Sequence, residues 1–282
     1  MATVPHLYAT LADVKAMLGI TDAQSNAQIV LIIEGVSRTV DEYCRRHFFP
    51  LEQVRFFESG DAQELTLPGS DLLDISRIDL DKDDDGTYEE AWTSSTYWML
   101  EPANARLMIP PKPYWSIEIP KRNSNYFPVD LDRSIKVTGT WGYYDERSVA
   151  TTVHSVIGAA DTTISLHNAS TTLYPGQTIR IDNEQMRVTA VNGINVTVTR
   201  AINGTTGATH SVNTDVQTYS YPVVQDAVAH QSVLAFRQHN FPYGTVGVGD
   251  VATEPRIMTA AGLHPFVRSM LAPFRLTLMA GD

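Results

Sequence analysis

One segment of the sequence resembles a metal-binding loop. Residues 81–86 read Asp-Lys-Asp-Asp-Asp-Gly, and alternate carboxylates followed by a turn glycine match the first half of a calcium-binding loop. The match fails at the twelfth position, where Trp92 stands in place of the bidentate glutamate, and strand-like residues flank the segment instead of helices. We therefore interpret residues 81–86 as a solvated hairpin tip, and the sequence predicts no metal site.

A second segment imitates a dinucleotide-binding fingerprint. Gly247 and Gly249 have part of the required spacing, but they follow a glycine-rich stretch instead of a strand, and Pro255 interferes with the helix that should come next. This segment is better explained as a flexible link. The eight histidines are scattered without the spacing of metal ligands. The sequence thus predicts no cofactor.

Candidate nucleophiles are equally few. Cys44 is the single cysteine and lies on the apolar side of a predicted helix, which favours a buried small hydrophobe over a reactive thiolate. It excludes an intrachain disulfide and fits a reducing compartment. There is no Gly-x-Ser-x-Gly motif, and the acidic run at residues 71–90 is expected to face water. These observations predict a protein that is not an enzyme.

Composition narrows the functional classes further. With 282 residues, 43% hydrophobic and 19% charged, the chain has the composition of a globular protein with one large or two ordinary domains. A formal net charge of -11 argues against general binding of DNA or RNA, which requires clustered Lys and Arg. The N-terminal residues lack a basic region followed by a long apolar stretch, so we expect neither a signal peptide nor a membrane span.

Two helices are predicted near the N-terminus. Thr10 and Asp13 have the spacing of a helix cap, and Gly19 ends the short helix that follows. Thr21 and Gln24 form a possible capping box for a longer helix. The apolar residues of this longer helix recur at three- and four-residue steps: Ile29, Ile32, Ile33, Val36, Val40 and Tyr43.

The opposite side of the long helix carries acids four residues ahead of bases. Glu34 precedes Arg38, and Asp41 precedes Arg45, in the order that stabilises an isolated helix. We expect this face to be solvated or to contact a neighbouring subunit. Glu34, Arg38, Asp41 and Arg45 are therefore candidates for a subunit interface.

Short extended runs follow from residue 51 to residue 144. They are expected at residues 53–58, 64–67, 73–81, 97–100, 106–109, 117–119 and 134–143, with prolines at edges and turns. In the last run Ile135, Val137 and Trp141 alternate with Lys136 and Thr138, which predicts a sheet with one buried face.

Residues 151–221 have the pattern of a small all-β insert. The dipeptides Pro175-Gly176, Asn192-Gly193 and Asn203-Gly204 separate short alternating runs of Ile, Val and Thr. An amphipathic helix is then predicted to begin at Pro222 and to end near His239.

The predicted fold class is therefore α+β, with a small helical bundle, an antiparallel β region and an inserted all-β domain. Residues 1–150 and 220–282 would form the helical core with the β region and a C-terminal tail, and residues 151–219 the inserted module.

The stretch LADVKAMLGITDAQSNAQIVLIIEGVSRTVDEYCRRHF resembles the opening of phage head-to-tail connector proteins, the adaptors beneath the portal. The resemblance continues in the acidic hairpin IDLDKDDDGTYEEAW, the strand KVTGTWGYY, the helix YPVVQDAVAHQSVLAFRQHN and the tail LHPFVRSMLAPFRL. The β insert departs from the family. Its segments GQTIRIDNEQMRVTAVNG and TVTRAINGTTGATH resemble a β module of phage tail and virion proteins.

The resemblance implies a virion structural protein in the neck, assembled in the host cytoplasm. Copies would form a homo-oligomeric, dodecameric ring that joins the portal protein to a stopper or tail-completion protein. Genomic DNA would pass through the ring without specific binding, and an acidic channel wall suits that role because it releases no phosphate counterions.

The basic, aromatic tail is the expected portal-docking interface, because desolvated Arg and aromatic residues supply much interface energy. Its candidate residues are Arg256, Phe266, Arg268, Phe274 and Arg275. The alternative is that the tail packs on its own domain.

Two other functions compete with the connector hypothesis. A glycan-binding or adhesive virion protein would use the β insert, and exposed aromatic residues there would favour it; Tyr174 and Tyr219 are the aromatic residues of that segment. An enzyme such as a polysaccharide depolymerase is the third possibility.

Overall fold

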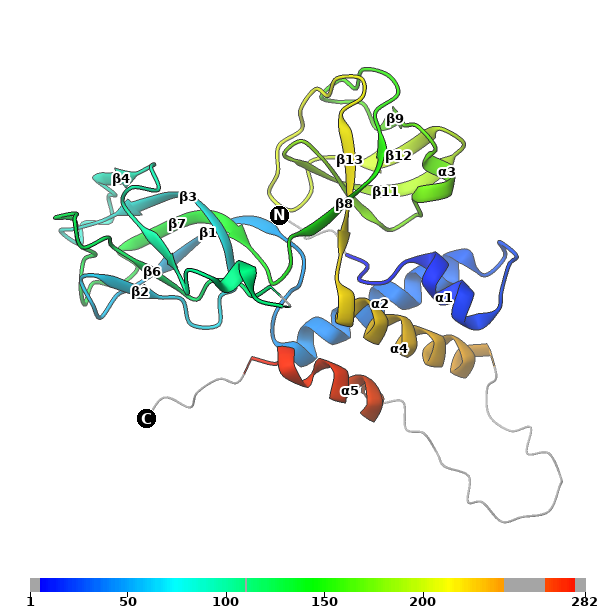
Figure 1. Ribbon diagram of the computed structural model, residues 1–282, viewed down its shortest axis with the longest axis horizontal. Helices are drawn as coiled ribbons and strands as arrows, with labels where there is room; N and C mark the ends of the chain where they lie inside the picture. The colour runs from blue at the N-terminus through cyan, green and yellow to red at the C-terminus, as the bar shows by residue number, and fades with distance from the viewer. Residues whose placement is uncertain (1–5, 110, 241–261, 277–282) are drawn as a thin grey trace, which may run out of the picture.

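The protein consists of a helical core, a β domain and a β module (Figure 1). The structure, a computed structural model, describes residues 6–109, 111–240 and 262–276. Helices and antiparallel sheets occur together, which confirms the α+β fold class. None of the helices within these described ranges has the length and apolar character needed to cross a membrane.

The helical core is built around two long helices. α2 (Asn26–Cys44) packs against α4 (Pro222–Asn240), and α1 (Leu11–Leu18) and α5 (Pro265–Leu271) both pack on α4. The apolar stripe predicted for the second helix supplies this core, since Ile29, Ile33 and Val40 are fully buried. Segments from both ends of the chain therefore meet in one bundle.

The first helix cap is confirmed and the second is wrong. The Thr10 hydroxyl accepts a hydrogen bond from the Asp13 amide at 3.1 Å, and the Asp13 carboxylate accepts one from the Thr10 amide at 2.9 Å. α2 begins later than the Thr21 and Gln24 pattern suggested, after Ser25, whose side chain makes no cap bond. Gln24 instead donates its amide to the carboxylate of Asp22, so a local turn takes the place of the capping box.

The β domain, residues 51–141, contains two sheets that share one core. The first has the order β1-β7-β3-β4, with β1 (Leu51–Phe57), β7 (Ile135–Trp141), β3 (Leu72–Leu80) and β4 (Glu90–Trp92). The second has the order β2-β6-β5, with β2 (Glu64–Thr66), β6 (Ser116–Glu118) and β5 (Met99–Glu101).

Side chains of β7 alternate as predicted, with Ile135, Val137 and Trp141 buried and Lys136 and Thr138 partly exposed. The extended run expected at residues 106–109 is wrong. A 3-10 turn, Ala105–Leu107, occupies this place, and Met108 and Ile109 pair with no strand among the described residues.

The β module, residues 146–220, is a six-stranded antiparallel sheet. Its order is β8-β13-β10-β11-β12-β9, with β8 (Glu146–Thr152), β13 (Asp215–Ser220), β10 (Thr178–Ile181), β11 (Glu184–Asn192), β12 (Asn195–Thr199) and β9 (Thr163–Ser165). A short helix, α3 (Ala169–Thr172), follows β9. A bridge between Val153 and Leu166 joins the two outer strands, so the sheet closes on itself around its own apolar core.

Candidate functional site

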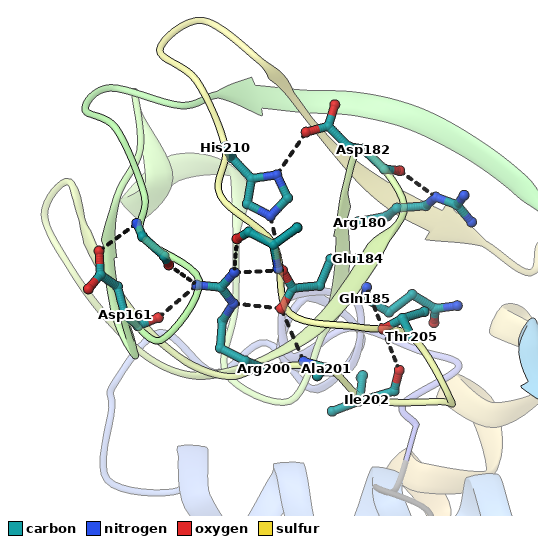
Figure 2. Close-up of polar contacts among 12 residues, drawn as sticks. Asp161, Arg180, Asp182, Glu184, Gln185, Arg200, Ala201, Ile202, Thr205 and His210 are labelled. Carbon is teal, nitrogen blue, oxygen red and sulfur yellow. Dashed lines mark hydrogen bonds and ion pairs between the residues drawn. The ribbon is translucent and has the colours of Figure 1, made fainter.

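The β module contains the grouping that most resembles an active site (Figure 2). Glu184 opens β11, Arg200 follows β12, and His210 lies in the loop before β13. The Glu184 and His210 side chains are fully buried. An acid, a base and a guanidinium in contact are the residue types of acid-base chemistry, so their hydrogen bonds decide whether they can react.

The Glu184 carboxylate is saturated with donors. Arg200 donates to both of its oxygens in a fork with distances of 2.6 and 2.6 Å. The amides of Ala201 and Ala208 donate at 3.1 and 2.9 Å, and His210 Nε2 lies at 3.0 Å. Burial alone would raise the pKa of Glu184, but the hydrogen bonds from Arg200, Ala208 and His210 outweigh it and lower this pKa to about 2.

Arg200 also joins two loops to the end of β12. Its NH1 group donates to the carbonyls of Gly158 and Asp161 at 2.8 and 3.0 Å, and its NH2 group donates to the carbonyl of Ala208 at 2.6 Å. A carboxylate with this set of partners has no lone pair directed at a substrate. The grouping is therefore a structural centre of the β module, and the sequence analysis missed it because its members are separated by 10 to 26 residues and match no motif.

A buried polar junction attaches the β module to the N-terminal segment. The His6 ring stacks on Phe49 at 3.8 Å, its Nδ1 lies 2.8 Å from Thr178 Oγ1, and its Nε2 accepts from Asn203 at 2.6 Å. Burial lowers the pKa of His6 to about 3, so the ring is neutral at physiological pH. Asn203 also donates to Gln185 at 2.8 Å.

The predicted subunit-interface residues have tertiary partners that change their pairing. Glu34 forms an ion pair with Arg187 of β11 at 2.9 Å and not with Arg38. Arg38 pairs with Asp41 at 3.1 Å and donates to the His6 carbonyl at 2.9 Å. The ion pairs predicted between residues four apart on α2 are thus wrong, because the β module and the N-terminal segment lie against this side of α2 and supply other partners.

Asp41 and Arg45 differ in their availability for a partner subunit. Burial raises the pKa of Asp41 to about 7, and its carboxylate accepts the Tyr8 hydroxyl at 2.5 Å. Arg45 is exposed and ends α2 with a φ of 56°. Of the four candidates, Arg45 is therefore the one that stays exposed on the surface of the chain.

The candidate docking residues of the tail also lie in different surroundings. Arg256 is outside the described residues. Phe274 is buried in the helical core, with ring centroids 5.8 Å from Phe48 and 5.3 Å from Tyr143. Phe266 is 53% exposed and Arg268 and Arg275 are exposed, so these three can contact a partner, whereas Phe274 packs within the chain.

The acidic segment forms an exposed turn between β3 and β4. Oxygen atoms of Asp81, Asp83, Asp85 and Glu89 lie within 4.8 Å of one another. The buried Asp81 carboxylate accepts the amides of Asp84 and Gly86 at 2.8 and 2.9 Å, which defines the turn. The charge of Asp85 raises the pKa of exposed Asp83.

The aromatic residues of the β module do not form an exposed platform. Tyr174 and Tyr219 are both partly buried and pack against the helical core. A glycan-binding surface uses exposed rings, so their position weakens the adhesive alternative.

A match to a protein family supports the resemblance noted in the sequence. Residues 8–69 match the family described as phage gp6-like head-tail connector protein. No curated protein matches the chain. A chain from the neck of an empty GTA particle, computed with C6 symmetry, is similar with 10% identity and a TM-score of 0.42, covering 100% of this chain and 96% of that chain. Residues 8–69, which include α1 and α2, are therefore similar to the phage gp6-like head-tail connector family.

Proposed function

We propose that copies of this chain form a ring in the virion neck, between the portal and the stopper or tail-completion protein. The observation that carries the proposal is the position of the family match. Residues 8–69 include α1, α2, β1 and β2, and α2 lies at the centre of the helical core. The matched helix contacts α4 and, through Glu34, the β module.

The charge of the chain supports passage of DNA through the ring without retention. Each copy has a formal net charge of -11, and a ring multiplies this charge around its axis. Phosphates are bound by clustered Lys and Arg that displace counterions, and an acidic wall lacks this driving force. DNA would therefore move past the ring during packaging and ejection.

The exposed part of the tail is the proposed portal-docking surface. Phe266 and Arg268 lie on α5, and Arg275 follows it with its guanidinium 5.5 Å from the centre of the Tyr43 ring. Arg256 belongs to the same proposal. Exposed aromatic and Arg side chains are the residue types that supply much of the binding energy at interfaces.

We also propose that residues 151–219 are an insert within the helical core. Glu146 at the start of β8 pairs with Ser220 at the end of β13, so the chain leaves and returns at one place. Termini that lie close together are what domain insertion requires. Replacing the whole β module, residues 146–220, by a short Gly-Ser link should leave a cooperative melt, at a lower temperature because the contacts of His6 and Glu34 are lost. A chain that no longer folds would contradict the proposal.

Electron microscopy tests the assignment directly. The protein is mixed with purified portal, and intact particles are imaged in parallel with particles made without it. We expect a ring directly beneath the portal and loss of tail attachment when the chain is absent. Density on the capsid shell or at the tail tip, or tailed particles formed without the chain, would contradict the proposal.

A further inference from the structure

One end of the β domain exposes a group of large apolar side chains. Leu107, Met108, Ile109 and Trp115 are 79%, 41%, 100% and 54% exposed. We call these four residues the apolar tip. Large exposed apolar groups that lie together mark interaction sites in soluble proteins. The sequence between Pro102 and Ile117 contains Arg106 and Lys112 as its charged residues, so the tip has basic neighbours in an acidic protein.

The apolar tip lies at the beginning of β3. Leu72, the first residue of this strand, exchanges two backbone hydrogen bonds with Tyr114, of 3.1 and 2.8 Å. The Lys112 amide donates to the Ala105 carbonyl at 3.0 Å, which holds the residues before and after the tip together. This end of the β domain adjoins the helical core, because Trp141 of β7 pairs with Leu72 and leads to the buried Tyr143.

The other end of β3 carries the opposite charge. Leu80 leads into the acidic hairpin, residues 81–90, which contains six acids and one lysine. A hollow beside Phe56, which is 53% exposed, is lined by Asp81, Asp84, Asp85, Gly86, Tyr88, Asp132 and Arg133, so its lining contains four acids and one base. A nine-residue strand is about 30 Å long. The two ends are thus separate surfaces, with β4 marking the outer one in Figure 1.

We propose that the apolar tip of one copy docks on the acidic hairpin of a second copy. Leu107 and Ile109 would cover Phe56, and Lys112 would face the carboxylates of the hairpin. The occupant is a second copy of this chain because both complementary surfaces occur on one molecule, at opposite ends of β3. Such a head-to-tail contact is heterologous, and it produces a ring when the rotation between copies closes.

This inference rests on the proposed ring and gives it a specific contact. Burial of the apolar side chains would supply most of the free energy of association, and the opposite charges would select the partner surface and its orientation. Contacts between the two ends of the β domain also leave α5 and the β module free for other partners.

Sedimentation velocity over a range of protein concentrations measures the contact. The tip variant combines Leu107→Ser and Ile109→Ser, and the hairpin variant combines Asp84→Lys and Asp85→Lys. Each should raise the dissociation constant about tenfold or more, because two contacting side chains are lost or repelled. The control Val156→Ser removes an apolar side chain that is 69% exposed on the β module, and this variant should associate like the unmodified chain.

Mixing the two variants decides whether the contact joins unlike surfaces. The tip variant retains an intact hairpin and the hairpin variant retains an intact tip, so an equal mixture should form a one-to-one dimer that grows no further. A monomeric mixture, or an unmodified chain that stays monomeric throughout, would overturn the inference. Circular dichroism and thermal melting confirm that each variant is folded.

The inference and the proposed function fail in different ways. If particles show a ring beneath the portal while both variants associate normally, the contact is wrong and the neck assignment stands. If each variant alone associates weakly and their mixture forms the expected dimer, but the chain is absent from the neck, the contact stands and the proposed function is wrong.

Discussion

Glu34 on α2 and Arg187 on β11 form an ion pair, with 2.9 Å between the carboxylate oxygen and the guanidinium nitrogen. The two residues are 153 positions apart in the chain, and their side chains are 27% and 16% exposed. The pair connects the helix matched by the connector family to the β module, and it lies on the helix face that the sequence assigned to solvent or to a neighbouring subunit.

Exchanging the charges of this pair tests whether it orients the β module. Glu34→Arg alone should lower the free energy of unfolding by about 1 kcal/mol, since two positive charges then meet at a partly exposed site. The double variant Glu34→Arg with Arg187→Glu should recover most of the loss. Chemical denaturation of the four proteins of the cycle gives the coupling energy. Additive effects would mean that the two side chains act independently.

The buried His6 ring should make the stability of the junction between the N-terminal segment and the β module sensitive to acid. Its pKa is about 3 in the folded chain and 6.5 in the unfolded chain, so the unfolded chain binds more protons between these values. The free energy of unfolding should therefore be unaffected by His6 above pH 6.5 and should fall as the pH decreases toward 3, by up to about 1.4 kcal/mol per pH unit. Urea titrations between pH 7.5 and 4 measure the slope.

The variant His6→Ala should be less stable at pH 7 and should lose this part of the pH dependence. His154→Ala, at an exposed position of the β module, is the matched control and should retain the slope. Identical slopes for His6→Ala and the unmodified chain would show that the junction does not cause the acid sensitivity.

Removing Arg200 should destabilise the β module severely. Arg200→Ala leaves the buried Glu184 carboxylate without its bidentate partner, and breaking such a pair costs about 3 to 5 kcal/mol. Arg147→Ala breaks the partly exposed pair with Asp145 and should cost only about 1 kcal/mol. Thermal melting compares the two. A small effect of Arg200→Ala would contradict the structural role given to this centre.

Glu184 adds a second pH dependence to the stability of the chain, because its pKa is lower in the folded chain than in the unfolded chain. Its pKa is lowered from 4.5 to about 2, so its contribution is fully present above pH 4.5 and is lost as the pH falls toward 2. Glu184→Gln should therefore lower stability more at pH 7 than at pH 2. Equal losses at both pH values would refute a role for the carboxylate charge.

The tail residues separate docking from folding. The combined variant Phe266→Ala, Arg268→Ala and Arg275→Ala should reduce co-sedimentation with portal about tenfold or more while leaving the melting temperature nearly unchanged, because these side chains are exposed. Phe274→Ala should instead cost about 3 to 5 kcal/mol of stability, because its ring is buried. Unchanged portal binding by the combined variant would refute the docking surface.

Local patterns in the sequence were sufficient for several elements. The three- and four-residue spacing of Ile29, Ile33 and Val40 predicted the buried stripe of α2, and the alternation of Ile135 and Val137 predicted the buried face of β7. These patterns work because backbone geometry relates neighbours in sequence to the faces of a helix or strand. The resemblance to connector proteins was confirmed in the same N-terminal region.

Tertiary structure decided which charges pair and which residues are buried together. Glu34 pairs with Arg187 and not with Arg38. His6 contacts Thr178 and Asn203, and Glu184 pairs with Arg200. No spacing rule reports these contacts, because each joins segments that come close only after the sheets and helices have packed. By itself the sequence determined the helices, the alternating strand and the likeness to connectors; the folded chain alone determined its polar junctions, since desolvation and partner distance depend on packing.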